Sequence, residues 1–207
     1  FAERANPDIA GRPQLIVGNR QLLFGGMGRL TENSIVKIQN KTHAVTAEVI
    51  VPESGAQGVI VAQGGLVGGW ALYAKSGRPK YCYNFYGMER YYVEGANKIP
   101  AGKHEVRMEF AYDGGGLAKG GTVTLYVDGK KCGEGRVEKT QPLGFSLDET
   151  CDVGFGAGSP VTYEYGIHDN KFSGEVNWVE IDIGKDAINL DHLITPEDRL
   201  RVAMARQ

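Results

Sequence analysis

Two carboxylates stand two positions apart near the end of the chain, in Glu180-Ile181-Asp182. On a β-strand such residues share one face at about 7 Å, since the rise is about 3.3 Å per residue. Paired carboxylates can hydrolyse glycosides, but the strand array Glu-x-Asp-x-x-Glu would need a third carboxylate where this chain has Lys185. We therefore expect the solvated outer face of a strand, and no catalytic residue in this chain.

Aromatic residues concentrate between positions 70 and 92. In Tyr81-Cys-Tyr83-Asn-Phe85 the odd residues share one strand face, while Cys82, Asn84 and Tyr86 share the other. An aromatic sheet face either belongs to the core or stacks on sugar rings, whose C–H faces fit an apolar ring. Both interpretations stay open. The second gives the candidate glycan-binding residues Trp70, Tyr73, Tyr83, Tyr86 and Tyr91.

Metal sites are poorly supported. Asp148 and Asp152 lie near Gly154, and loop carboxylates can hold calcium, but their spacing matches no EF-type loop. They are weak calcium candidates. The four histidines form no i, i+4 pair, so zinc is not expected. The chain is predicted to hold no metal and no cofactor.

Short stretches of alternating apolar and polar residues indicate strands with one buried face. They occur at 20–25, 34–40, 45–51, 58–64, 69–75, 79–86, 88–94, 106–110, 122–127, 130–138, 150–155 and 172–183. Glycine-rich turns separate them and no helices are interleaved, which predicts an all-β antiparallel sandwich or jelly roll. Glycine fills 30 of 207 positions, about twice its usual share, and we assign the excess to tight turns.

Three local features refine this pattern. Asp128-Gly129 between two alternating stretches predicts a tight hairpin turn with positive φ. Val176-Asn-Trp178 and the stretch 179–183 alternate out of phase, so we expect a β-bulge between Trp178 and Val179. Thr195 and Pro196 begin a predicted C-terminal helix at about 195–206.

The chain divides into an irregular lead-in or linker at 1–18, a sandwich domain at 19–184 and a C-terminal extension at 185–207. Since the first residue is Phe1 rather than Met, we expect a fragment of a longer protein. The 23 basic and 25 acidic residues are evenly matched, so neither nucleic acid nor a membrane is an expected partner. An odd number of cysteines and no signal-peptide pattern favour a cytoplasmic location, with a periplasmic or secreted parent as the alternative.

Several stretches together resemble the C-terminal region of the long bacterial arylsulfatases, over nearly the whole chain. They are Phe1-Ala-Glu-Arg, Gly58-Val-Ile-Val-Ala-Gln-Gly-Gly65, Gly69-Trp-Ala-Leu-Tyr73, Tyr83-Asn-Phe85, Phe110-Ala-Tyr-Asp-Gly-Gly-Gly116, Val123-Thr-Leu-Tyr-Val-Asp-Gly-Lys130 and Gly133-Glu-Gly-Arg-Val-Glu-Lys-Thr140. The resemblance implies a concanavalin A-like or laminin-G-like sandwich that follows an alkaline-phosphatase-like catalytic domain. It also implies calcium and formylglycine in that missing domain.

This chain departs from the sulfatase pattern at the nucleophile. The family needs Cys-x-Pro/Ala-x-Arg, and the nearest approach here, Cys132-Gly-Glu134-Gly-Arg136, has Glu134 at the central position. The resemblance therefore implies a non-catalytic accessory domain that supports stability, the active-site rim or oligomerisation. Its expected partners are the upstream catalytic domain and a second copy of the chain. The alternative is a lectin-like module that binds a glycan through its tyrosines.

Overall fold

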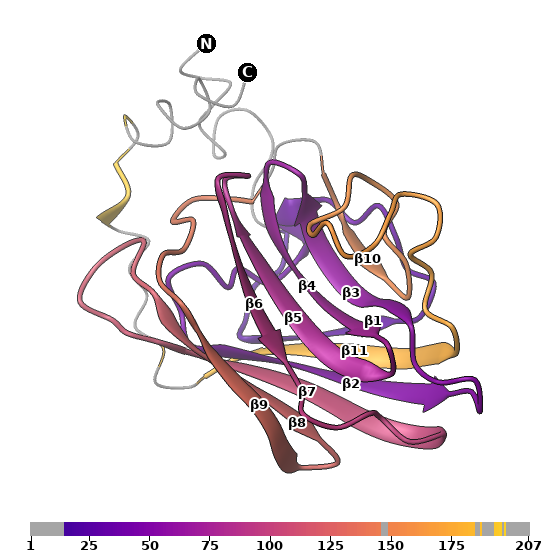
Figure 1. Ribbon diagram of the computed structural model, residues 1–207. Helices are drawn as coiled ribbons and strands as arrows, with labels where there is room; N and C mark the ends of the chain where they lie inside the picture. The colour runs from indigo at the N-terminus through magenta and orange to yellow at the C-terminus, as the bar shows by residue number, and fades with distance from the viewer. Residues whose placement is uncertain (1–14, 146–148, 185–186, 188–192, 196, 198–207) are drawn as a thin grey trace.

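The computed structural model describes residues 15–145, 149–184, 187, 193–195 and 197, which form two antiparallel sheets packed face to face (Figure 1). One sheet has the strand order β1-β11-β2-β7-β8-β9, and the other has the order β10-β3-β4-β5-β6. The elements are β1 Arg20–Phe24, η1 Glu32–Ser34, β2 His43–Val51, β3 Gly58–Gly65, β4 Gly68–Lys75, β5 Arg78–Phe85, β6 Glu89–Glu94, β7 Gly102–Tyr112, β8 Gly121–Val127, β9 Lys130–Val137, β10 Cys151–Val153 and β11 Glu175–Ile183. The predicted fold class, an all-β antiparallel sandwich, is confirmed.

The core lies between the two sheets and is built from alternate residues of each strand. On β7, Val106 and Met108 are fully buried, as are Val123 and Leu125 on β8. Burying a large apolar side chain stabilises the fold by roughly 1.5–3 kcal/mol. The alternating pattern in the sequence therefore predicts correctly which side chains of these strands face the core.

The outer faces of the two sheets differ. Strands β3, β4 and β5 of the five-stranded sheet are buried on both sides, because outer residues such as Tyr73 and Cys82 pack with Val161 and Tyr165 of the segment 154–174. The six-stranded sheet is buried on its inner side, while Thr124 and Tyr126 on its outer side keep partial exposure. Over the residues that the structure describes, the six-stranded sheet thus presents its strand surface to a ligand, and the five-stranded sheet does so at its edge strand β6, where Tyr92 is exposed.

Glycine supplies backbone conformations that other residues adopt at a cost. The hairpin between β8 and β9 turns at Asp128 and Gly129, with φ values of 50° and 71°, which confirms the predicted turn. Gly69 has φ +146° and a Cβ there would lie 2.1 Å from the carbonyl oxygen of Gln63. At Gly69 only glycine allows β3 and β4 to approach each other.

The segment 34–40, predicted as a strand, pairs with no strand in the structure, so that prediction is wrong. The backbone N–H of Val36 instead donates to the side-chain Oε1 of Gln21 at 2.8 Å. Ile35, Val36 and Ile38 are buried, and this burial produced the apolar pattern without a β-ladder.

The predicted bulge in β11 exists but lies one residue earlier than expected. Val176 opposes Val49 and Trp178 opposes Glu48, so Asn177 is the extra residue. The predicted helix at 195–206 falls almost wholly outside the described residues. None of the described residues belongs to a helix long and apolar enough to cross a membrane.

Candidate functional site

Two of the predicted glycan-binding aromatics lie in the core between the sheets. Trp70 is fully buried, and its Nε1 donates to Oε1 of Gln63 at 3.1 Å. The hydroxyl of Tyr83 accepts the backbone N–H of Gln141 at 2.7 Å, and burial raises the pKa of this tyrosine. Because both polar groups find partners inside the protein, these rings serve packing.

Tyr73 points outward from the five-stranded sheet but is covered. Its ring meets that of Tyr165 edge-on, with centroids 5.5 Å apart, and its hydroxyl donates to Glu164 Oε2 at 2.6 Å. Lys80 Nζ donates to Glu164 Oε1 at 2.7 Å. This network ties the covering segment to the sheet, so Tyr73 acts in the structure as an anchor.

Tyr86 and Tyr91 are half-buried and lie in different places. Tyr86 has φ 54° just after β5, and its ring contacts that of Phe85 at 4.9 Å. Tyr91 packs against the core, and burial together with its hydrogen bond to Glu89 raises its pKa to about 12. The five candidate aromatics therefore do not combine into one surface.

Asp152, a weak calcium candidate, is buried and already has hydrogen-bond donors. Its carboxylate accepts the backbone N–H groups of Arg29 at 2.6 Å and of Ala157 at 2.9 Å. Since N–H donors repel a cation, this carboxylate is built to join two loops. Asp148 lies outside the described residues. Within the described part of the chain, His, Cys, Asp and Glu side chains form no group of three that could hold a metal.

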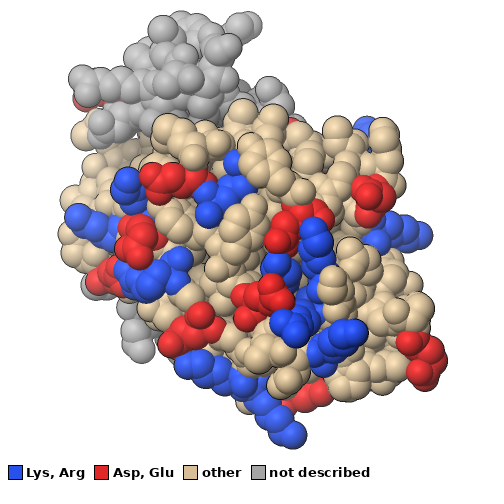
Figure 2. Space-filling view, viewed as in Figure 1, with Lys and Arg blue, Asp and Glu red and all other residues tan. Residues whose placement is uncertain are grey.

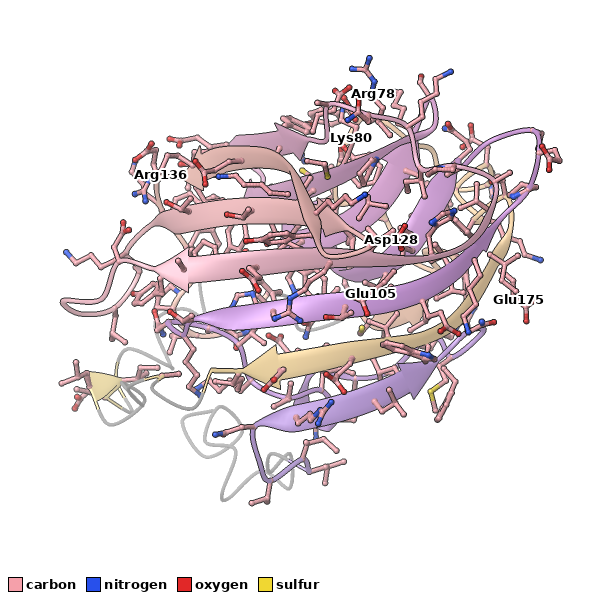
Figure 3. All side chains as sticks on the ribbon, turned by 90° about the horizontal axis from the view of Figure 1, so that it is seen from below. Arg78, Lys80, Glu105, Asp128, Arg136 and Glu175 are labelled. Atoms are coloured by element: carbon pink, nitrogen blue, oxygen red, sulfur yellow. The ribbon has the colours of Figure 1, made fainter. Side chains whose placement is uncertain are left out.

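The six-stranded sheet carries the more promising set of side chains on its outer side (Figure 3). We call this the outer sheet face. It comprises Leu22, Phe24, Thr46, Glu48, Arg107, Glu109, Thr124, Tyr126, Trp178 and Glu180. Glu180 points outward as expected from its sequence context.

Strand register arranges these residues in rows. One row runs Leu22, Glu180, Thr46, Arg107 and Tyr126 across five strands. In the next row Phe24 opposes Trp178 and Trp178 opposes Glu48. Neighbouring strands lie about 4.8 Å apart and the two rows are offset by two residues, so the backbones at Trp178 on β11 and Tyr126 on β8 are separated by roughly 16 Å. The two aromatic residues thus flank a polar strip that has the width of a short oligosaccharide.

Hydrogen bonds fix the polar strip between the rings. Arg107 donates from one terminal nitrogen to Oγ1 of Thr46 at 2.5 Å, and from Nε to Glu109 Oε1 at 2.9 Å. Burial, and then the hydrogen bond to Glu109, raise the pKa of Tyr126. The Arg107 head group is therefore held in place between the two rings.

The carboxylates of the outer sheet face are paired with cations. Glu48 meets Lys103 at 2.8 Å and accepts from Asn177 Nδ2 at 2.8 Å, and both contacts lower its pKa. Glu180 pairs with Arg20. A surface of paired charges and half-exposed rings can hold hydroxyl groups and C–H faces at once, so this arrangement suits binding of a sugar.

Trp178 and Tyr126 are not among the binding residues predicted from the sequence. Tyr126 holds an outward position in the alternation of 122–127, where an aromatic residue on a polar face is itself a signal. Trp178 gave no such signal, because its face depends on where the bulge falls.

A cleft of about 280 Å³ lies at one end of the sandwich. Its wall includes Gly25, Gly26, Gly154, Phe155, Gly174 and Glu175. Four of the ten residues that line this cleft are glycine, so the cleft offers a ligand fewer side-chain groups than the outer sheet face does.

Comparisons with known proteins agree on the fold. No family model and no curated protein matches this chain. Among solved structures, the CBM40 of the Ruminococcus gnavus IT-sialidase, bound to α2,3-sialyllactose, matches with a TM-score of 0.52 and 12% identity, over 82% of this chain and 95% of that chain. A structure described as NanB plus Optactamide also has a TM-score of 0.52 and 12% identity, over 82% of this chain and 27% of that chain. The LG1-3 region of the laminin α2 chain gives a TM-score of 0.48 at 14% identity, over 84% of this chain and 32% of that chain. None of these supports the sulfatase parent that the sequence resemblance implied.

Proposed function

We propose that this chain is a carbohydrate-binding module whose outer sheet face binds a neutral oligosaccharide. The observation that carries the proposal is the placement of Trp178 and Tyr126 on either side of Thr46 and Arg107. A sugar ring would stack its C–H face on each aromatic ring. Its hydroxyl groups would exchange hydrogen bonds with the strip between them.

The charge on this face favours a neutral ligand. Glu48, Glu109 and Glu180 lie within the rows that the sugar would cover, and their cations already have carboxylate partners. A ligand carboxylate there would meet like charges and find no free cation. Sugar hydroxyl groups, in contrast, can donate to these carboxylates.

The fold comparison supports the class of function. The R. gnavus CBM40 shares this fold and was solved with sialyllactose, so a sandwich of this kind can serve glycan binding. The accessory role in an arylsulfatase rests on sequence resemblance alone, with no specific observation to favour it here.

An array of neutral and acidic oligosaccharides, followed by calorimetry on the neutral hits, tests the proposal. We expect Trp178→Ala and Tyr126→Ala each to weaken binding about tenfold or more, because each removes a stacking surface. Ile167→Ala is the matched control, since Ile167 is an exposed apolar residue in the segment that covers the other sheet. Binding by the Trp178 and Tyr126 variants at wild-type strength, or no binding to any glycan, would contradict the proposal.

A further inference from the structure

Arg90 has an unusual set of partners for an arginine that packs against the protein. Arg20, Arg107 and Arg136 each pair with a carboxylate. Arg90, on the outer side of β6, instead donates to backbone carbonyl oxygens, and its guanidinium carbon lies 4.0 Å from the ring centroid of Tyr163. No carboxylate of the described residues pairs with it.

The hydrogen bonds of Arg90 hold the side chain and leave its forked end weakly engaged. Nε donates to the carbonyl of Val161 at 3.0 Å. The two terminal nitrogens reach the carbonyls of Gly87 and Leu66 at 3.5 and 3.4 Å, distances at which hydrogen bonds are weak. The contact with Leu66 is exposed and that with Gly87 is part-buried, so solvent reaches the forked end of the guanidinium at the nitrogen that contacts Leu66.

Apolar and hydroxyl groups surround this end of Arg90. The tips of the β3–β4 and β5–β6 hairpins bring exposed Leu66, Val67 and Met88 beside it. Tyr92 is partly exposed on the same strand, and its hydroxyl accepts from Thr162 Oγ1 at 3.1 Å. Since the Tyr92 hydroxyl also hydrogen-bonds the Cys82 side chain, Tyr92 offers a ligand the exposed part of its ring.

We propose that Arg90, Tyr163 and Tyr92 form a second site, separate from the outer sheet face, that binds a carboxylate-bearing sugar. A guanidinium held by neutral carbonyls keeps its full positive charge and a fixed plane, which a carboxylate matches with two hydrogen bonds. One arginine balances one negative charge, so a carboxylate fits better than a doubly charged phosphate. The apolar tips would cover C–H groups of the sugar.

NMR titration of the wild-type protein with D-glucuronate and with N-acetylneuraminate tests this site. We expect a saturable shift of the Arg90 Nε–H resonance with a carboxylate sugar, and none with D-glucose or inorganic phosphate at equal ionic strength. Arg90→Gln should abolish binding and Arg90→Lys should weaken it about tenfold or more, because lysine lacks the fork. Arg78→Gln is the control, since Arg78 pairs with Glu94 on the same sheet.

The outcomes separate this proposal from the proposed function. Trp178→Ala should leave glucuronate binding unchanged, because Trp178 lies on the outer sheet face and not at the second site. If Arg90→Gln unfolds the protein, Tyr163→Ala takes its place and should weaken binding severalfold. The proposal is overturned if neither carboxylate sugar shifts Arg90, if phosphate or glucose shifts it equally, or if Arg90→Gln binds like the wild type.

Discussion

A buried histidine makes the stability of this protein depend on pH. His43 Nδ1 donates to the carbonyl of Lys41 at 2.8 Å, which leaves Nε2 buried without a partner beside Phe110. Burial lowers the pKa of His43 to about 4, from 6.5 in an unfolded chain. The folded state therefore resists protonation, and its stability should fall by about 3 kcal/mol as pH drops from 6.5 to 4.

Urea unfolding of the wild type and of His43→Gln over this pH range measures the effect. The difference in unfolding free energy between the two proteins should shrink or reverse towards pH 4, because the variant has no group to protonate. His168→Gln at an exposed position provides the control and should run parallel to the wild type. A constant difference between wild type and His43→Gln would show that His43 does not carry the dependence.

At the scale of the element, the segment 154–174 depends on Glu164. Its carboxylate accepts from Tyr73 and Lys80, and Lys75 Nζ donates to its backbone carbonyl. Burial opposes the ionised form, but Lys80 and Tyr73 outweigh it and lower the pKa of Glu164. Glu164→Gln should leave the positive charge of Lys80 only partly compensated. We expect this to lower the free energy needed to open the segment by about 1–3 kcal/mol.

Hydrogen exchange across 154–174 is the measurement for Glu164→Gln. Faster exchange in this segment, with strands β7 and β8 protected as before, is the expected result. Glu175→Gln changes an exposed carboxylate at the start of β11 and should leave exchange unaltered. Equal exchange in all three proteins would mean that apolar packing of Val161 and Tyr165 holds the segment without the ion pair.

The position of the β-bulge shows how a strand predicted correctly can still give the wrong surface. Alternation places the strand 179–183 and its buried face, but both Val176 and Trp178 look equally suited to point inward. A shift of one residue reverses every side chain that follows. With Asn177 as the extra residue, and its side chain bonded to Glu48, Trp178 turns outward onto the candidate site. That choice depends on packing against β2, which no local pattern contains.

The tyrosines between 70 and 92 show that a strand face predicted correctly can still be covered by a distant segment. Their alternation on β5 is real, and it correctly separates Tyr81 and Tyr83 from Cys82. Whether the other face is open depends on Val161 and Tyr165, which arrive from a segment some eighty residues later. Sequence periodicity therefore predicts which side chains share a face, but not which faces a distant loop will cover.

For the whole molecule, the sandwich follows from alternation, turn chemistry and the lack of interleaved helices, since these local features act throughout the chain. The parent enzyme does not follow in this way. Any sandwich of this class would have glycine-rich turns and alternating strands. A resemblance in these features therefore identifies the architecture more securely than the parent enzyme.

The charge distribution of the whole molecule predicts how each site responds to salt. Acidic and basic side chains are interspersed over the face seen in Figure 2, and the net charge is −2, so we expect little long-range attraction of a charged ligand to the molecule. The neutral oligosaccharide should therefore bind the outer sheet face with an affinity that changes less than about twofold between low and high sodium chloride. Binding of glucuronate at Arg90 should weaken severalfold, because salt screens an exposed ion pair.

Calorimetry of both ligands across the salt series is the measurement, with Arg90→Gln expected to leave binding of the neutral ligand unaffected. A steep salt dependence of neutral binding would place charge at the centre of recognition and contradict a role for stacking on Trp178 and Tyr126.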